Sequence, residues 1–121
     1  MIDGTLPPSA DSLNINNAET DFLLDELGNV LGGVRTPYVD APAAVLSGLG
    51  QSGDSFCGLF GTTALFNADQ MASLYIDESG YLDAVTAAAN SAVAAGFLLQ
   101  KDADLIIAWA PEQWRSQVEK L

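Results

Sequence analysis

The stretch LGNVLGGVRTPYVDAP, residues 27–42, joins the most constrained backbone of the chain to its most isolated positive charge. Its three glycines allow positive φ angles, whereas Pro37 and Pro42 fix φ and remove amide donors. Arg35 lies between them and is the only basic residue before Lys101, in a chain with 16 acidic residues. We therefore expect tight turns in the backbone here. We also expect an acidic side chain or another acceptor close to the guanidinium of Arg35.

The composition predicts one globular domain over residues 1–121. Hydrophobic residues make up 49% of the 121 residues, and two Trp, three Tyr and five Phe are present. A chain of this length and apolar content can bury a core. We expect an extended surface segment over residues 1–20, a hairpin with Pro- and Gly-rich extended and loop segments over 21–66, and a helical subdomain over 67–121.

The formal charge of −12 bears on the choice of partners. Binding to nucleic acid or to an anionic membrane surface requires clustered Lys and Arg, and the four basic residues are scattered. We therefore expect no nucleic-acid partner and no membrane partner. The acid excess itself favours solubility.

The chain has one cysteine, Cys57, and no histidine. One cysteine cannot form a disulfide within the chain, and without histidine the commonest metal ligand and general base are missing. No segment has the spaced acids of a calcium loop. We expect no metal and no cofactor. The first residues lack the features of a signal peptide, and residues 81–99 predict a core helix and not a membrane span, so the localisation stays open.

The first half of the chain shows strand and turn patterns. Leu6 and Leu13 are candidate anchors for the segment over residues 1–20. The run FLLDELGNVLGGV, residues 22–34, predicts a hairpin whose turn includes Gly28 and Asn29. Residues 36–46 predict an extended segment at a sheet edge, because prolines remove ladder hydrogen bonds from a central strand.

A glycine-rich loop follows over residues 47–55. Gly48, Gly50 and Gly53 have the spacing of a dinucleotide-binding fingerprint, but Asp54 would place a carboxylate where phosphate binds, so we favour a plain loop. Residues 56–66 predict an apolar segment that passes through the core. Cys57 would then be a small buried hydrophobe, the alternative being a reactive thiol beside Arg35.

The second half predicts helices. Asn67 and Gln70 have the spacing of a capping box, with Met71, Leu74 and Tyr75 on one face. A helix from about residue 78 or 79 to 95 carries an alanine-rich apolar stripe and ends at a glycine cap, Gly96. A third helix starts near residues 101–104, and Pro111 either kinks it or begins a fourth. The fold class is therefore α+β, with an irregular, hairpin-containing first half packed on three to four C-terminal helices.

No catalytic residue can be assigned. A serine nucleophile requires a sharp elbow and a base, and the sequence around Ser52 offers neither. The paired acids at residues 25–26, 77–78 and 102–104 lie at turns or helix starts, where capping explains them better than acid–base chemistry.

Arg35, Tyr38 and Asp40 are the one candidate site. Arg35 and Asp40 can form a salt bridge because Pro37 bends the run between them. In the structural interpretation, which we favour, Arg35 hydrogen-bonds to carbonyls left free by the glycine-rich loop and clamps the hairpin to the helices. In the functional interpretation, these residues line a cleft or clamp an anion or carboxylate.

An ordered set of motifs along nearly the whole chain resembles the C-terminal portion of the alpha/beta hydrolase domain-containing proteins. The motifs are DGTLPP at 3–8, DELGN at 25–29, GGVRTPYVDAPAA at 32–44, CGLFG at 57–61, LY at 74–75, Tyr81, AAGFLL at 94–99 and DA at 102–103. Members are several times longer, and the resemblance implies that the nucleophile elbow, acid and histidine of the serine hydrolase lie upstream of the part represented here.

Two hypotheses follow. In the first, the chain is a non-catalytic C-terminal segment or subunit of an esterase-like serine hydrolase, which packs on the catalytic body or self-associates and has no activity in isolation. In the second, it is an autonomous acidic protein-interaction module.

Overall fold

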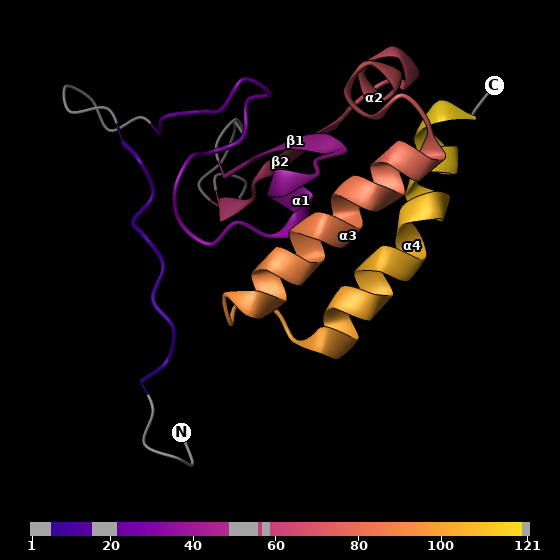
Figure 1. Ribbon diagram of the computed structural model, residues 1–121. Helices are drawn as coiled ribbons and strands as arrows, with labels where there is room; N and C mark the ends of the chain where they lie inside the picture. The colour runs from indigo at the N-terminus through magenta and orange to yellow at the C-terminus, as the bar shows by residue number, and fades with distance from the viewer. Residues whose placement is uncertain (1–5, 16–21, 49–55, 57–58, 120–121) are drawn as a thin grey trace.

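The computed structural model describes residues 6–15, 22–48, 56 and 59–119 (Figure 1). Within them the chain is α+β, as predicted, with a two-stranded antiparallel sheet and four helices. The elements in chain order are α1 (Pro37–Asp40), β1 (Ala44–Ser47), β2 (Thr62–Leu65), α2 (Ala68–Tyr75), α3 (Glu78–Ala94) and α4 (Gln100–Val118).

Helices α3 and α4 form an antiparallel pair, and the sheet and α1 lie along one side of it (Figure 1). Small residues allow the close approach of the two helices, since alanine adds little bulk between their backbones. The buried alanines are Ala88, Ala89 and Ala92 on α3 and Ala103 and Ala110 on α4.

The ends of the helices follow the sequence signals. Asn67 and Gln70 form the predicted capping box at the start of α2, with both hydrogen bonds present. At the end of α3, Gly96 has a φ of +85°, and Gly96 and Phe97 donate amide hydrogen bonds to Val93 and Ala92. This pattern is a Schellman cap, which confirms the predicted glycine stop.

The core lies where α2, α3 and α4 meet the end of the sheet. Met71 is fully buried, and Tyr81, Val85 and Trp114 pack around it. Phe66, directly after β2, joins the same cluster. The first half of the chain therefore contributes to covering the helices.

Gln117 of α4 connects the helices to the sheet. Its Nε2 donates to the carbonyl oxygens of Ala43 and Phe66, at 2.9 Å each. The same Ala43 carbonyl accepts the amide of Phe66, one step beyond the β1–β2 register of Ala44 opposite Leu65. One side chain thus fixes the end of the sheet to α4.

The predicted hairpin over residues 22–34 is confirmed. Leu24 and Val30 form an antiparallel bridge, and Gly28 has a φ of +95°. Leu13 pairs with Gly32, so it does hold its segment in place, whereas Leu6 is 86% exposed and is not an anchor.

The extended segment predicted over residues 36–46 is only partly right. Residues 37–40 form the short helix α1, because Pro37 stands at its first position, where the missing amide costs no helical hydrogen bond. The chain becomes a strand only at Ala44.

The prediction that residues 56–66 pass through the core is wrong for most of that segment. Phe56, Leu59, Phe60 and Leu65 are all more than half exposed, and Phe66 is the only buried residue among those of the segment that the structure describes. Glycines punctuate this run, so its side chains are not held to one buried face. Cys57 and most of the glycine-fingerprint loop lie outside the described residues.

Pro111 lies inside α4, which is a single helix from Gln100 to Val118. Pro111 therefore does not begin a fourth C-terminal helix. No helix among the described residues is long and apolar enough to cross a membrane.

Candidate functional site

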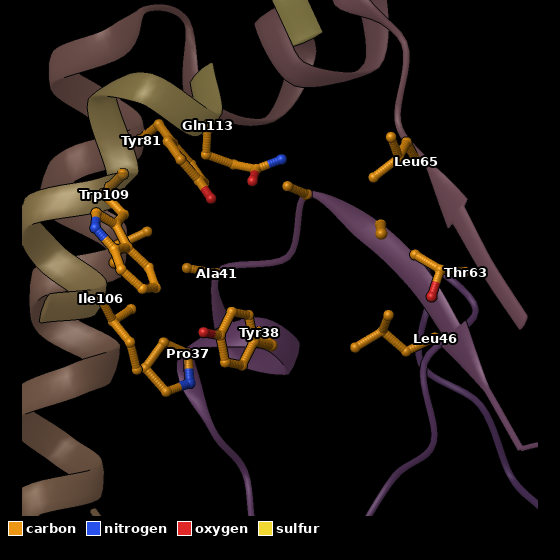
Figure 2. A pocket seen from close by; sticks show the side chains of 14 residues that line it. Pro37, Tyr38, Ala41, Leu46, Thr63, Leu65, Tyr81, Ile106, Trp109 and Gln113 are labelled. Carbon is orange, nitrogen blue, oxygen red and sulfur yellow. The ribbon is translucent and has the colours of Figure 1, made fainter. Parts of the chain in front are cut away.

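An apolar cavity of about 250 Å³ opens between the sheet, α1 and the helix pair. Pro37, Tyr38 and Ala41 form one side, and Tyr81, Ile106 and Trp109 form the side made by α3 and α4 (Figure 2). Leu46, Thr63 and Leu65 close it from the sheet. The cavity thus combines residues from every element except α2.

Tyr81 is the principal polar group of the wall. Its ring packs against Tyr75 and Trp114, with centroids 5.0 and 6.0 Å away, and the residue is only 6% exposed. Its hydroxyl points into the cavity (Figure 2) and has no hydrogen-bond partner among the described residues. Burial, with a smaller contribution from Tyr38, raises the pKa of Tyr81 and keeps the hydroxyl protonated.

Gln113 provides a second polar group beside that hydroxyl. Its Nε2 donates to Oε1 of Gln117, which leaves its own Oε1 without a donor in the described part of the chain. Figure 2 shows the carboxamide of Gln113 directed into the cavity near Tyr81. The cavity therefore has a polar corner at Tyr81 and Gln113. The hydroxyl-bearing residues Tyr38 and Thr63 also line it, and the rest of the wall is apolar.

None of the described residues that line the cavity carries a formal charge. A hydroxyl and a carboxamide can hold and orient a neutral group, but neither is an acid or base near neutral pH. The geometry can therefore bind and position a molecule, and it provides no nucleophile with a base beside it.

Arg35 and Asp40 form an ion pair away from this cavity. Nε of Arg35 lies 2.8 Å from Oδ1 of Asp40, and Nη2 lies 3.4 Å from Oδ2 of Asp25. Nη1 also donates to the Val30 carbonyl at 3.0 Å. The hydrogen bond to Asp40 raises the pKa of Arg35, against the opposing effect of burial.

The bond to the Val30 carbonyl is of the kind that the structural interpretation expects. The other partners, Asp25 and Asp40, lie in the turn and in α1, so these contacts join the turn to α1 and not to the C-terminal helices. Tyr38 alone of the three candidate residues lines the cavity. An anion-binding role for Arg35 and Asp40 stays a prediction.

The paired acids have local structural partners. Oδ1 of Asp25 accepts the amides of Leu27 and Asn29, and Asp77 caps α3 through the amide of Gly80. Glu78 pairs with Arg115 of α4. Among the residues that the structure describes, no group of three His, Cys, Asp or Glu could hold a metal ion.

Sequence reasoning missed Tyr81 and Gln113 as site residues. Tyr81 lies four residues before Val85, on the buried face of α3. An aromatic hydroxyl on an alanine-rich apolar stripe could have indicated a polar group inside the fold. Gln113 gave no such signal, because its position depends on how α4 packs against the sheet.

The described residues thus form an α+β fold with a largely apolar, uncharged cavity. The sequence model of the alpha/beta hydrolase domain family matches residues 1–108. The chain therefore belongs to the alpha/beta hydrolase domain family. Comparisons with curated proteins and with solved structures gave no match.

Proposed function

We propose that this chain is a non-catalytic part of an esterase-like serine hydrolase, which packs on the catalytic body and lines its substrate cleft. The observation that carries the proposal is an apolar rim around the cavity mouth. Tyr38, Leu65 and Trp109 all line the cavity, and they are 57%, 65% and 62% exposed. Contiguous exposed apolar groups of this kind mark interaction surfaces.

The absence of histidine from the chain supports a non-catalytic role. A serine hydrolase uses an imidazole to take the proton of its nucleophile and return it to the leaving group. This chain has no histidine, so those groups would come from the catalytic body. The apolar cavity would then contact the substrate portion that extends away from the reacting ester.

Further apolar side chains extend the surface available for packing. Phe56 and Phe60 form an edge-to-face pair with centroids 5.8 Å apart, and both are more than half exposed. Leu59 is 76% exposed beside them. Covering these groups would supply the hydrophobic gain that association with a body requires.

The first experiment tests intrinsic chemistry. The purified chain is treated with a fluorescent fluorophosphonate, which labels active serines, and assayed with p-nitrophenyl acetate and butyrate. We expect no labelling and no hydrolysis above the buffer rate. Labelling of a serine in the pure chain would overturn the assignment of a non-catalytic role.

The second experiment tests association with a hydrolase. The tagged chain is used as bait in a native extract of its source cells, and captured proteins are probed with the fluorophosphonate. We expect the wild-type chain to retain a fluorophosphonate-reactive protein and the rim variant Leu65→Ser/Trp109→Ser to lose it. A matched variant at exposed side chains outside the rim, Leu99→Ser/Leu105→Ser, should retain it.

The second candidate is an autonomous acidic interaction module. It is favoured because the first half of the chain covers part of the helices. Val85 is buried with the help of this chain's own first half, and Leu82 and Ile106 pack against the same cluster. A monomer in sedimentation that unfolds in one two-state transition, and that captures no fluorophosphonate-reactive protein, would favour the module over the hydrolase part.

A further inference from the structure

We propose that the cavity is a binding site for a neutral aromatic molecule bearing one hydroxyl group, which hydrogen-bonds to the hydroxyl of Tyr81 and to Oε1 of Gln113. The inference goes beyond the proposed function. It concerns a property of this chain alone, and it holds or fails whether or not a catalytic body exists.

The position of the Tyr81 hydroxyl is the first line of support. The residue is more than nine-tenths buried, and its hydroxyl has no protein partner among the described residues and points into the cavity (Figure 2). No buried side-chain oxygen or nitrogen among the described residues lacks a partner, so this hydroxyl is open to the cavity and not sealed in the core. A ligand oxygen that enters the cavity can therefore reach it and replace water as its partner.

Gln113 limits which polar group of a ligand can bind beside Tyr81. The Tyr81 hydroxyl can donate or accept, whereas Oε1 of Gln113 carries no proton and only accepts, and Nε2 of Gln113 already donates one proton to Gln117. A ligand hydroxyl can accept from Tyr81 and donate to Gln113 at the same time. A bare hydrocarbon leaves both groups unsatisfied, and an ether or ketone satisfies only Tyr81.

The size of the cavity limits the ligand. Cavities of about 150 Å³ bind benzene. The volume of about 250 Å³ here accommodates one ring with a short substituent. The rings of Tyr38, Tyr81 and Trp109 in the wall are suited to edge-to-face or offset contacts with such a ring.

Charge argues for a neutral ligand. No charged side chain is among the described residues of the wall, so a bound ion would lose its hydration without a counter-charge. The net charge of −12 further disfavours an anion.

The test compares four ligands that share a tolyl ring: p-cresol, toluene, p-toluate and 4-methylbenzylammonium. Each is titrated into the full chain and followed by amide chemical shifts in heteronuclear NMR. We expect p-cresol to bind roughly five- to tenfold more tightly than toluene, the ratio that one neutral hydrogen bond provides. Shifts should centre on the amides of Tyr81, Ile106 and Gln113, and the two ions should bind more weakly than p-cresol.

The variant Tyr81→Phe keeps the ring and removes the hydroxyl. We expect it to bind toluene as the wild type does and to prefer p-cresol over toluene less than the wild type does, because only the hydrogen bond to Gln113 remains. Leu46→Trp, which fills the cavity from β1, should abolish binding of both. Its matched control is Leu105→Trp, which adds the same ring on an exposed position of α4 outside the cavity and should bind normally.

Three outcomes would overturn the proposal: no binding of p-cresol up to its solubility limit, equal affinity for p-cresol and toluene, or tighter binding of either ion. A Tyr81→Phe variant whose preference for p-cresol is as large as that of the wild type would do the same. Circular dichroism checks that each variant is folded. If Leu46→Trp does not fold, the comparison of p-cresol with toluene on wild type and Tyr81→Phe still decides the question.

Discussion

The side chain of Asn29 hydrogen-bonds to the backbone of β1 at Ala44. Its Nδ2 donates to the Ala44 carbonyl at 3.1 Å, while its Oδ1 accepts the amide of Leu46 at 2.8 Å. Asn29 is 1% exposed and is the one buried polar residue in the described chain. One carboxamide thus pairs with a strand edge as a neighbouring strand would, and joins the turn at residues 25–30 to the sheet.

Replacing Asn29 with Asp should destabilise the fold. The carboxylate can still accept from Leu46, but it cannot donate to Ala44 and places a negative charge in a buried position. We expect the free energy of unfolding to fall by about 1–3 kcal/mol, measured by urea denaturation. The control is Asn90→Asp, the same change at an exposed position on α3, which should leave the urea midpoint nearly unchanged.

The clamp formed by Arg35 should depend on the shape of its guanidinium. Arg35→Lys keeps the charge but cannot contact Asp25, Asp40 and the Val30 carbonyl at once. We expect a loss of about 1 kcal/mol in the free energy of unfolding, measured by urea denaturation.

The matched control for this clamp is Arg115→Lys. Arg115 pairs with Glu78 on the exposed surface, where solvent screens the interaction, so no measurable change is expected. An Arg35→Lys variant as stable as the wild type would show that charge alone, and not the fork of hydrogen bonds, holds the turn.

The features predicted best from the sequence are those determined by a few adjacent residues. The side chains of Asn67 and Gln70 each accept a hydrogen bond from the backbone amide of the other residue, three positions away. Gly96 supplies the positive φ that the α3 cap requires. Such patterns need no tertiary information. The α+β class followed from them, because alanine-rich helical periodicity and turn signals occupy different halves of the chain.

The features that the sequence did not predict depend on contacts between distant residues. Leu65 is 65% exposed although it lines the cavity, so its exposure depends on the gap between the sheet and the helix pair, which apolar composition cannot show. The cavity brings together residues 37–46, 63–65, 81–85 and 106–113. No local pattern places Tyr81 beside Gln113, so the site could only be found once the packing was known.

A strained turn at Ile76 offers a stabilising substitution. Ile76 joins α2 to α3 with a φ of +71° and a ψ of −58°, and Asp77 donates its amide to the Tyr75 carbonyl at 2.8 Å. This is a γ-turn with positive φ at its centre, a conformation in which a β-branched residue is strained. Ile76 is 84% exposed, so its side chain contributes little packing.

Ile76→Gly should therefore raise the free energy of unfolding by about 1 kcal/mol, the relief of strain exceeding the entropy cost of glycine. Ile76→Val keeps the β-branch and should give no gain. Thermal unfolding of the two variants and the wild type measures the difference, and a lower melting temperature for Ile76→Gly would contradict the strained-turn interpretation.

Alkaline pH should destabilise the fold through two buried tyrosines. Burial raises the pKa of Tyr75, whose hydroxyl donates to the Pro42 carbonyl at 2.7 Å, and burial likewise raises the pKa of Tyr81. In the unfolded chain both phenols ionise near pH 10. Above about pH 10 the unfolded state therefore binds fewer protons than the folded state, and the free energy of unfolding falls as pH rises.

Urea unfolding followed by tryptophan fluorescence between about pH 8 and about pH 11 measures this slope. Tyr75→Phe removes one of the two phenols, so its stability should fall less steeply above about pH 10 than that of the wild type. The variant also loses the hydrogen bond to Pro42, which lowers its stability at neutral pH, so the slope and not the starting value is the test. Equal slopes for the two proteins would mean that Tyr75 titrates alike in the folded and unfolded chains, and that its burial does not keep it protonated.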